Sequence, residues 1–411
     1  MPLFRLLITR VFAVIAPICL PLVAQESVVD ATDPGFAQTV GNANTTPVVQ
    51  RTASGPWGDL EYYQLNLEPP LDYLVLSPCW DARQFPTTWR FLHHDPAEVR
   101  AILTGAELDA ATVDGLMATA VIDVGANHVE IRPPDEVVLS LKGNIREQLY
   151  SQFVDPGSSD PFSEPLSISA DGFAAMATGS RLPQPTIDLI SALTYSRSNM
   201  RLFSDISLVM QRQPDEDSMR LILSTLLRQR SLNARLRLSE TANFKAIAEY
   251  WSAGGRSKDF LPMLESINTT DGVETLDIVH LLPPTPRKLL NTFARPLMSM
   301  GTLFPDCFWT ALNFFSFEPS DRYLGRDRFG DWLNDQYDEV QKPLRVGDIV
   351  LVIDMANQKP IHACNYVAAD IVFTKNGLSL MKPWVLQPLD EVLSFYRTDE
   401  SIGVIYFRKR P

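Results

Sequence analysis

Cys307 and His362 are the residues of this sequence best suited to carry out a reaction. Pro305 and Asp306 come just before the cysteine. Proline in a first turn and aspartate as an N-cap both predict that a helix begins here. Backbone N–H groups at such a start stabilise a thiolate and can donate to an oxyanion. A cysteine followed by a histidine is the order of a thiol nucleophile and its base, so the chemistry indicated is acyl transfer at an amide or ester.

His362 needs a rigid mount within reach of that helix. The apolar run 349–353 predicts a strand covered on both faces, and a second strand restarts at residue 361 after a polar turn. In such an antiparallel hairpin, alternation puts His362, Cys364 and Tyr366 on one face. A helix over 307–316 that covers this face would bring the thiol to the imidazole. The alternative is that Cys307 is a small apolar residue of the core, the usual role of an unpaired cysteine.

The order of these features resembles the NlpC-type superfamily of bacterial cell-wall cysteine peptidases, which are papain-like. The resemblance rests on the helix-opening Cys307, the turn Gly347-Asp348 before an apolar strand, and His362 at the start of the next strand. It covers roughly residues 300 to 411 and no part of the chain before them. It implies a nucleophilic cysteine, a histidine base and a peptide amide of the cell wall as substrate.

In that family a third polar residue, on the following strand, orients the histidine. Counting without gaps places this residue at Thr374, and Lys375 and Asn376 lie one and two positions further on. Asn376 suits the orienting role better chemically. The three residues therefore stay alternatives.

Two departures from the family pattern favour a second interpretation. The family has a small glycine after the histidine where this chain has Cys364, and a serine or glycine after the nucleophile where it has Phe308 and Trp309. Such bulky residues narrow a pocket or mark a scaffold that has lost its reaction, and a disulfide between Cys307 and Cys364 would silence the site. The alternative function is a catalytically inactive, exported binding protein. An acyltransferase or lipid hydrolase on the same fold is a third interpretation.

Residues 1–24 have the pattern of a secretory signal peptide. Arg5 and Arg10 precede an apolar run that is interrupted by Pro17 and Pro21 and ends at Ala24. We therefore expect an exported protein, periplasmic or extracellular, and the rest of the chain has no apolar run that would cross a bilayer. Residues 25–56 show no sustained period and indicate a flexible leader.

Composition limits the partners. The formal net charge is −13 and the pI is about 4.9, so nucleic acid is not an expected partner because no basic stripe could neutralise its phosphates. Three cysteines follow residue 24, too few for a disulfide framework. His93-His94-Asp95 has metal-ligand residue types, but adjacent side chains point apart and no third ligand is near. We predict no metal and no other cofactor.

The remaining chain predicts an α+β protein of three regions. Residues 57–180 read as an α+β region of unknown role, with short strands at 120–124, 128–132 and 137–141. Residues 181–298 are mainly helical, because apolar residues recur there at helical spacing. Residues 299–411 form the papain-like domain, a helix packed on an antiparallel sheet. No repeat is firm enough to indicate a solenoid.

Overall fold

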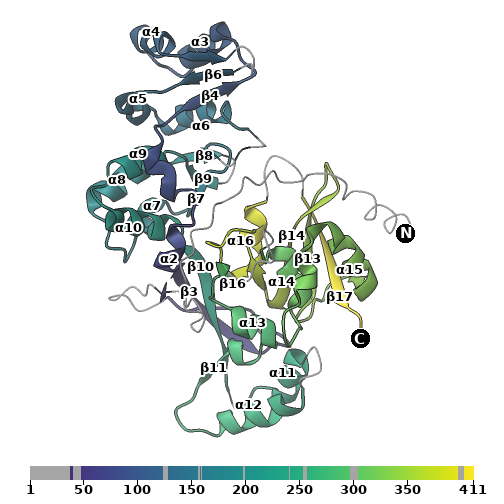
Figure 1. Cartoon of the computed structure of the whole chain (residues 1–411). Coiled ribbons are helices and arrows are strands. Elements are labelled where there is room, and N and C mark those ends of the chain that lie inside the picture. Colours follow the sequence, from purple (N-terminus) through teal and green to yellow (C-terminus); the bar gives the residue numbers. More distant parts are fainter. Residues whose placement is uncertain are drawn as a thin grey trace. The chain divides into compact units, whose positions relative to one another are not determined.

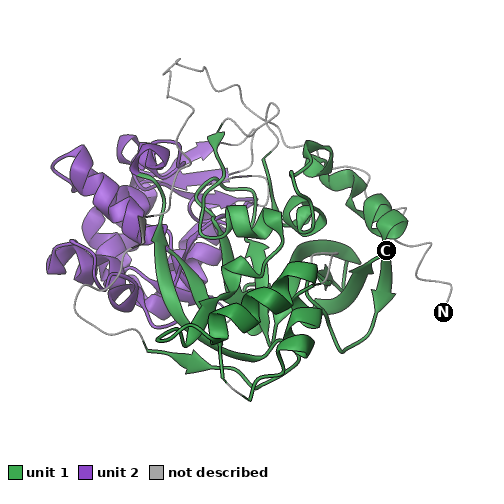
Figure 2. Ribbon diagram, turned by 90° about the horizontal axis from the view of Figure 1, so that it is seen from below, with its two compact units in different colours: residues 1–70, 229–411 green, residues 71–228 purple. Residues whose placement is uncertain are grey.

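The computed structural model describes residues 38–39, 48–123, 128–155, 158, 160–197, 200–239, 241–252, 257–296, 304–396 and 402–411. The predicted signal peptide and most of the predicted leader lie outside these residues. The described chain is a mixed α+β protein with several antiparallel sheets, which confirms that part of the prediction. It divides into two compact units: unit 1 holds the residues up to 70 and from 229 on, and unit 2 holds residues 71–228 (Figure 2).

Unit 1 is built from two separate stretches of chain, because strand β3 (Asp59–Glu68) pairs with strand β10 (Gln229–Arg237). The pairing is antiparallel and runs without a break from Leu67 opposite Gln229 to Asp59 opposite Arg237. All of unit 2 is therefore inserted between two neighbouring strands of one sheet. The units divide the chain at residues 70 and 228, whereas the sequence analysis expected boundaries at 180 and 298.

The first sheet of unit 1 has the order β1-β3-β10-β11, with β2 beside β3. Its shorter strands are β1 (Gln38–Thr39), β2 (Gln50–Arg51) and β11 (Thr275–Asp277). Three helices belong to the same stretch of chain: α11 (Phe244–Trp251), α12 (Phe260–Asn268) and α13 (Pro284–Leu289). The region expected to be mainly helical thus also contains β10 and β11.

The second sheet of unit 1 has six antiparallel strands in the order β12-β17-β13-β14-β15-β16 (Figure 1). They are β12 (Tyr337–Val340), β13 (Ile349–Asp354), β14 (Lys359–Ala368), β15 (Ile371–Lys375), β16 (Trp384–Pro388) and β17 (Ile402–Lys409). Helices α14 (Cys307–Asn313), α15 (Phe329–Gln336) and α16 (Leu389–Ser394) accompany this sheet. The predicted hairpin is present, with Val352 of β13 opposite His362 of β14.

The turn into β13 depends on Gly347. Its φ of +85° is a conformation that side chains with a Cβ rarely adopt, and an added Cβ would lie 2.1 Å from a carbon of the Phe315 ring. Asp348 follows, and its Oδ2 accepts the Arg345 N–H at 2.7 Å. The Gly-Asp pair noted in the sequence is therefore a tight turn packed against the end of the α14 segment.

The two sheets of unit 1 meet along β10 and β16. The Leu386 N–H donates to Ser231 Oγ at 3.3 Å, and Gln387 Nε2 donates to the Arg230 carbonyl at 3.4 Å. One apolar core contains residues of both sheets and of α11, α12 and α14. Residues 299–411 consequently share their core with strands from earlier in the chain.

Unit 2 repeats one topology twice. Each module runs strand, two helices, two strands and two helices, and its antiparallel sheet has the order first, third, second strand. The first module comprises β4 (Trp89–Leu92), α3 (Pro96–Gly105), α4 (Ala110–Ala118), β5 (Val121–Asp123), β6 (His128–Ile131), α5 (Asp135–Ser140) and α6 (Gly143–Ser151). The second comprises β7 (Leu166–Ile168), α7 (Phe173–Met176), α8 (Gln184–Ala192), β8 (Tyr195–Arg197), β9 (Met200–Phe203), α9 (Ile206–Gln211) and α10 (Glu216–Leu226).

The two modules resemble each other in which positions are buried more than in the residue types at those positions. Their last helices bury residues at the same spacing, Ile145 and Leu149 in α6 and Met219 and Leu223 in α10. Because the residue types at these positions differ, the repeat did not stand out in the sequence. What recurs is the order of elements.

The strand predicted at 137–141 is wrong, because this segment lies largely in helix α5. Its valines and leucines favour a strand, but Pro134 precedes Asp135 and Glu136, which place two acids in a first helical turn. Negative charge at a helix N-terminus is stabilising, and here it decides the local structure. The region expected to be helical from 181 also contains strands β8 and β9.

Candidate functional site

Cys307 is the first residue of α14, as predicted. Asp306 caps the helix, and its Oδ1 accepts the Trp309 N–H at 2.9 Å. The thiol is buried, with 1% of Cys307 exposed. Phe308 and Trp309 are also buried, packing against Phe329 and Trp384 with ring centroids 4.5 and 6.0 Å apart. The bulky residues after the cysteine therefore belong to the core.

Two groups from other elements lie near the Cys307 thiol. The backbone N–H of Ala363, on β14, and the guanidinium of Arg326 each lower the pKa of this thiol, against the larger effect of burial. Arg326 opens a short 3-10 helix (Arg326–Arg328), and its Nε donates to Asp306 Oδ2 at 2.5 Å. Nothing in the sequence pattern pointed to Arg326, which lies far from any of the motifs.

His362 lies on β14 as predicted, but α14 covers the other face of this strand. The helix contacts the face of Ala363 and Asn365, whose Nδ2 donates to the Ala311 carbonyl at 3.1 Å. The opposite face, with Cys364, packs with residues of α16 instead. The thiol thus meets β14 at the backbone of the residue that follows His362.

The His362 ring is held by two hydroxyl groups. Thr374 Oγ1 lies 3.0 Å from Nε2, and the Tyr396 hydroxyl lies 3.0 Å from Nδ1. The rings of His362 and Tyr396 are nearly parallel, with centroids 4.8 Å apart. These bonds leave neither ring nitrogen bonded to Cys307 within the part of the chain that the structure describes. The contact between Tyr396 and His362 was not predicted, because Tyr396 follows helix α16 and no sequence motif surrounds it.

Of the three residues considered for the orienting role, Thr374 contacts the ring. Asn376 contacts Thr374 instead, with its Oδ1 3.2 Å from Thr374 Oγ1. Lys375 is buried, and its Nζ donates to the carbonyls of Gly377 and Ser379 at 2.8 and 2.9 Å. Burial lowers the pKa of Lys375 to about 7.

In the hydrogen bonds that link Thr374 to Asn376 and Gln387, the donor and the acceptor are fixed at each step. Gln387 Nε2 faces the Arg230 carbonyl, which can only accept, so Gln387 Oε1 is the atom that takes the bond from Asn376 Nδ2 at 2.8 Å. Asn376 therefore turns its Oδ1 to Thr374, and the single hydroxyl proton of Thr374 goes to that oxygen. Thr374 Oγ1 must then accept from His362, which requires a proton on Nε2.

The consequence is a fixed tautomer of the neutral His362 ring. With the proton on Nε2, Nδ1 carries the lone pair and accepts the bond from the Tyr396 hydroxyl. A backbone carbonyl on β10 thus selects, through three side chains, the nitrogen that can act as a base. Nδ1 is that nitrogen.

Burial keeps both reactive groups neutral in this arrangement. It lowers the pKa of His362 to about 3, and the nearby Arg326 adds to this effect. Burial, followed by the charge of Asp306, raises the pKa of Cys307 to about 12. Burial also raises the pKa of Tyr396, with the neighbouring thiols Cys307 and Cys364 contributing. A thiol and a neutral imidazole are present, rather than a thiolate and an imidazolium.

All three described cysteines, Cys79, Cys307 and Cys364, are free. The bridge between Cys307 and Cys364, which would have silenced the site, does not form. Cys364 is fully buried, and burial raises the pKa of its thiol.

A metal centre finds no support within the described residues, where no group of three or more His, Cys, Asp or Glu side chains could hold an ion. In the cluster singled out in the sequence, Asp95 caps α3 by accepting the N–H groups of Ala97 and Glu98. His94 Nδ1 lies 2.6 Å from the Leu92 carbonyl.

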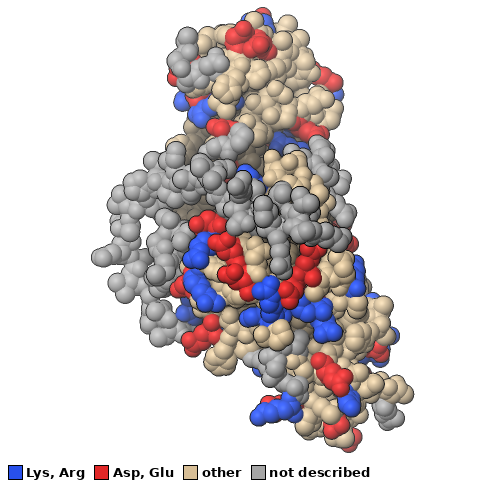
Figure 3. All heavy atoms as spheres, turned by 90° about the vertical axis from the view of Figure 1, so that its right-hand side faces the viewer, with Lys and Arg blue, Asp and Glu red and all other residues tan. Residues whose placement is uncertain are grey.

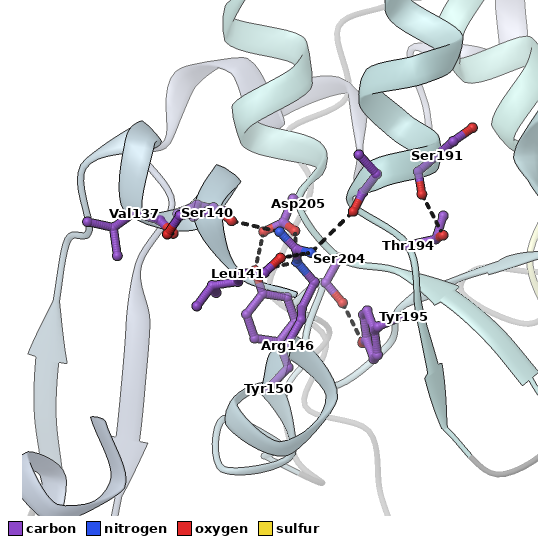
Figure 4. A network of polar contacts seen from close by, with 12 residues as sticks. Val137, Ser140, Leu141, Arg146, Tyr150, Ser191, Thr194, Tyr195, Ser204 and Asp205 are labelled. Carbon is purple, nitrogen blue, oxygen red and sulfur yellow. Dashed lines mark hydrogen bonds and ion pairs between the residues drawn. The ribbon is translucent and has the colours of Figure 1, made fainter. Parts of the chain in front are cut away.

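A second buried cluster of titratable groups joins the two modules of unit 2 (Figure 4). Arg146 and Asp205 are an ion pair with 3.2 Å between Nε and Oδ2, and the Tyr150 hydroxyl donates to Asp205 Oδ1 at 2.7 Å. The Nη atoms of Arg146 donate to the carbonyls of Val138, Leu141 and Ala192. Burial raises the pKa of Asp205 to about 6, although Arg146 opposes the shift. Every nitrogen of this guanidinium is occupied, so the cluster offers no free group for chemistry.

The outer surface is mixed in charge on the side drawn in Figure 3, where acidic and basic side chains alternate. On β17 and beyond it, Arg408 pairs with Asp348 at 2.6 Å and Arg410 with Asp338 at 2.9 Å. Among the described helices none has both the length and the apolar character needed to span a membrane. Comparisons of the chain with protein-family models, curated proteins and solved structures found no match.

Proposed function

We propose that this protein is an exported cysteine hydrolase, an amidase or peptidase, with Cys307 as nucleophile, His362 as base and Thr374 as the residue that orients the base. The family resemblance makes peptide amides of the bacterial cell wall the expected substrates. A helix that begins at a cysteine and packs on an antiparallel sheet supports a papain-like arrangement of residues 299–411.

The observation that carries the proposal is the directed chain of hydrogen bonds behind His362. It leads from the Arg230 carbonyl through Gln387, Asn376 and Thr374 to Nε2, and so leaves Nδ1 as the basic nitrogen. A buried histidine needs only one or two partners to be satisfied, whereas this chain also fixes the tautomer. A fixed tautomer is what a general base requires, because its lone pair must face the proton it takes.

The described arrangement is then a resting state. The Tyr396 hydroxyl occupies Nδ1, and burial keeps the thiol protonated and the ring neutral. Substrate binding has to part this hydroxyl from Nδ1 and, because the ring and the thiol lie on opposite faces of β14, also shift this strand so that the ring reaches the thiol.

The reaction follows from these positions. Nδ1 takes the proton of Cys307, and the thiolate attacks the amide carbonyl carbon. The C–N bond breaks as the imidazolium returns its proton to the leaving amine, which leaves a thioester on Cys307. Water then gives a proton to Nδ1 and attacks the thioester carbon. The acid product departs, and the proton returns to the sulfur.

The test is hydrolysis of synthetic cell-wall stem peptides by the full chain, followed by mass spectrometry. Cys307→Ser and His362→Gln should each lower the rate by about 10²–10⁴-fold, the contribution of a positioned nucleophile or base. Cys364→Ser is the matched control, because Cys364 is a buried cysteine on the same strand as His362. This variant should keep most of the activity. Hydrolysis that survives Cys307→Ser would refute the proposal.

One observation favours a different function, that of an exported binding protein without catalysis. The thiol is only 1% exposed, and the His362 nitrogens bond to Thr374 and Tyr396. If this is the function, the stem peptides bind but are not cleaved, and Cys307→Ser leaves their affinity unchanged. Isothermal titration with the same peptides separates the two candidates.

A further inference from the structure

We propose that a pocket of unit 1, separate from the site around His362, binds a free α-amino acid as its zwitterion, with an apolar side chain. The pocket has a volume of about 450 Å³ and lies where residues of β2 and β3 meet the turn between β14 and β15. This size is within the range of small-molecule sites. His362 lies near the start of β14, whereas the turn follows its end. The inference does not depend on the proposed function.

The first support is that two opposite charges line the pocket without pairing with each other. Arg51 lies on β2 and Asp370 in the turn after β14. Among the described residues, neither side chain makes an ion pair or a hydrogen bond. Glu61 lies opposite Arg51 in the pairing of β2 with β3, but its Oε2 lies 3.8 Å from Arg237 Nε instead. The pocket therefore offers one cation and one anion, which match the carboxylate and the ammonium group of a single ligand.

The second support is the pair of aromatic rings that line the same pocket, Trp57 and Tyr62. The polar end of each ring has another partner. Trp57 Nε1 donates to the Ala53 carbonyl at 3.3 Å. The Tyr62 hydroxyl donates to Gln50 Oε1 at 2.8 Å. The rings therefore offer a ligand apolar surface, against which an apolar side chain can pack, and their faces attract an ammonium group.

The third support is that hydrogen bonds hold both charged walls of the pocket in place. On one side the N–H of Thr52, next to Arg51, donates to the Leu60 carbonyl at 3.0 Å. On the other side the Asp370 carbonyl accepts the Leu389 N–H at 2.7 Å. Because the backbone that carries each charge is already fixed, a ligand has little of it to order on binding.

The charge around Tyr62 indicates which end of the ligand lies there. Burial, and after it the charge of Asp370, raises the pKa of the Tyr62 hydroxyl, with Glu391 and Asp390 adding to the effect. Glu391 and Asp390 belong to the first turn of α16, which begins at the Leu389 bonded to Asp370. The ammonium group is therefore expected beside Asp370 and Tyr62, and the carboxylate beside Arg51 on the opposite wall.

The experiment compares three ligands that share a phenyl ring and differ in charge. L-phenylalanine carries both charges, phenethylamine only the ammonium, and hydrocinnamate only the carboxylate. Each is titrated into the full chain at neutral pH by isothermal titration calorimetry. We expect phenylalanine to bind about tenfold more tightly than either analogue, because each analogue lacks one charge-assisted contact.

Three variants assign each charge of the ligand to its partner. Asp370→Asn should lower the affinity for phenylalanine to that for hydrocinnamate and leave hydrocinnamate binding unchanged. Arg51→Gln should lower it to that for phenethylamine and leave phenethylamine binding unchanged. Asp59→Asn, at an exposed acid of β3 outside the pocket, should change none of the three affinities. Circular dichroism of each variant checks that the fold is intact.

The inference is overturned if phenylalanine binds no more tightly than the two analogues, or if either pocket variant leaves its affinity unchanged. Phenethylamine that binds as tightly as phenylalanine, and only while Asp370 is present, would also overturn it, because the pocket would then take cations alone. The result is read separately from the hydrolysis of stem peptides, since none of these variants alters Cys307 or His362.

Discussion

Each unit has a buried network in which a titratable side chain bonds to a tyrosine hydroxyl, yet the two networks end differently. In unit 2 the Tyr150 hydroxyl donates to Asp205, and the opposite charge of Arg146 lies beside it. In unit 1 the Tyr396 hydroxyl bonds to His362, which is neutral and, among the described residues, has no carboxylate paired with it. In the unit 2 network the opposite charges of Arg146 and Asp205 pair with each other. In the unit 1 network the last group is the Nδ1 lone pair of His362, which faces a neutral hydroxyl.

This difference separates a structural network from one suited to proton transfer. The unit 2 cluster connects α6 of the first module to the second module through the Ala192 carbonyl and Asp205, so its charges stabilise the stacking of two repeats. In unit 1 the directed chain uses three side chains to orient one imidazole. Burial of a polar network is common to both, but only the direction of the hydrogen bonds indicates what the network can do.

The largest expected effect is on unit 2. Arg146→Met removes the counter-charge of a buried carboxylate, which should destabilise unit 2 by about 3–5 kcal/mol. Hydrogen exchange read by mass spectrometry should show faster exchange in α6 and β8. Arg100→Met is the matched control: its partner Asp114 is exposed, so about 1 kcal/mol or less is expected. If both variants behave alike, the unit 2 cluster has no structural role.

The second effect concerns the tautomer in unit 1. Thr374→Val keeps the shape but removes the acceptor of the Nε2 proton, and it leaves Asn376 Oδ1 without its donor. The loss of stability should be about 1–3 kcal/mol, the cost of leaving buried polar groups unpaired. The ¹⁵N shifts of His362 should move toward the tautomer with the proton on Nδ1, and hydrolysis should fall with them.

Thr374→Ser is the control for that change, because it returns the hydroxyl. It should restore both the ¹⁵N shifts and the activity. If Thr374→Val leaves the His362 tautomer unchanged, the directed chain does not select Nδ1, and the comparison between the two units loses its basis.

Local sequence signals were sufficient for some of these parts. Pro305 and Asp306 indicated the helix start at Cys307, and alternating apolar residues indicated the hairpin that carries His362. The count along the next strand reached Thr374, which contacts the ring. Each of these features depends on neighbours within a few residues, so a single sequence contains them.

The rest depends on contacts across long separations. Arg326 reaches Asp306 over 20 positions, and Tyr396 reaches His362 over 34. The pairing of β3 with β10 spans the whole of unit 2, and no local pattern marks two strands that far apart as partners. For the same reason the sequence did not predict which face of β14 is covered by α14. Alternation indicates which residues share a face, but not what packs on that face.

The third prediction is that acid acts on the two units in opposite directions. The pKa of His362 is lowered from 6.5 to about 3, so between these values the unfolded chain binds more protons and the stability from His362 is lost as pH falls. The pKa of Asp205 is raised from 3.8 to about 6, so there the folded state binds more protons and stability grows as pH falls. Each slope approaches about 1.4 kcal/mol per pH unit.

Hydrogen exchange between pH 4 and pH 6 measures these slopes separately for each unit. His362→Gln should flatten the slope of unit 1 alone, and Asp205→Asn should flatten that of unit 2 alone. Slopes of the same sign in both units would contradict the account of one neutral base and one buried acid.

The smallest effect should come from Tyr396→Phe, which keeps the ring that stacks on His362 and removes only the hydroxyl on Nδ1. One neutral hydrogen bond contributes about 0.5–1.5 kcal/mol, so a change of several-fold is expected. With Nδ1 vacant, the imidazole can take the proton of Cys307 once β14 shifts to bring the ring to the face of the thiol, and iodoacetamide should label this thiol faster, while Cys364 keeps its rate. If the labelling rate of Cys307 is unchanged, the Tyr396 hydroxyl does not compete with the thiol for the base. In that case Tyr396 would be for His362 what Tyr150 is for Asp205, a partner that only satisfies a buried group, and the contrast between the two units would narrow to the charge of Arg146.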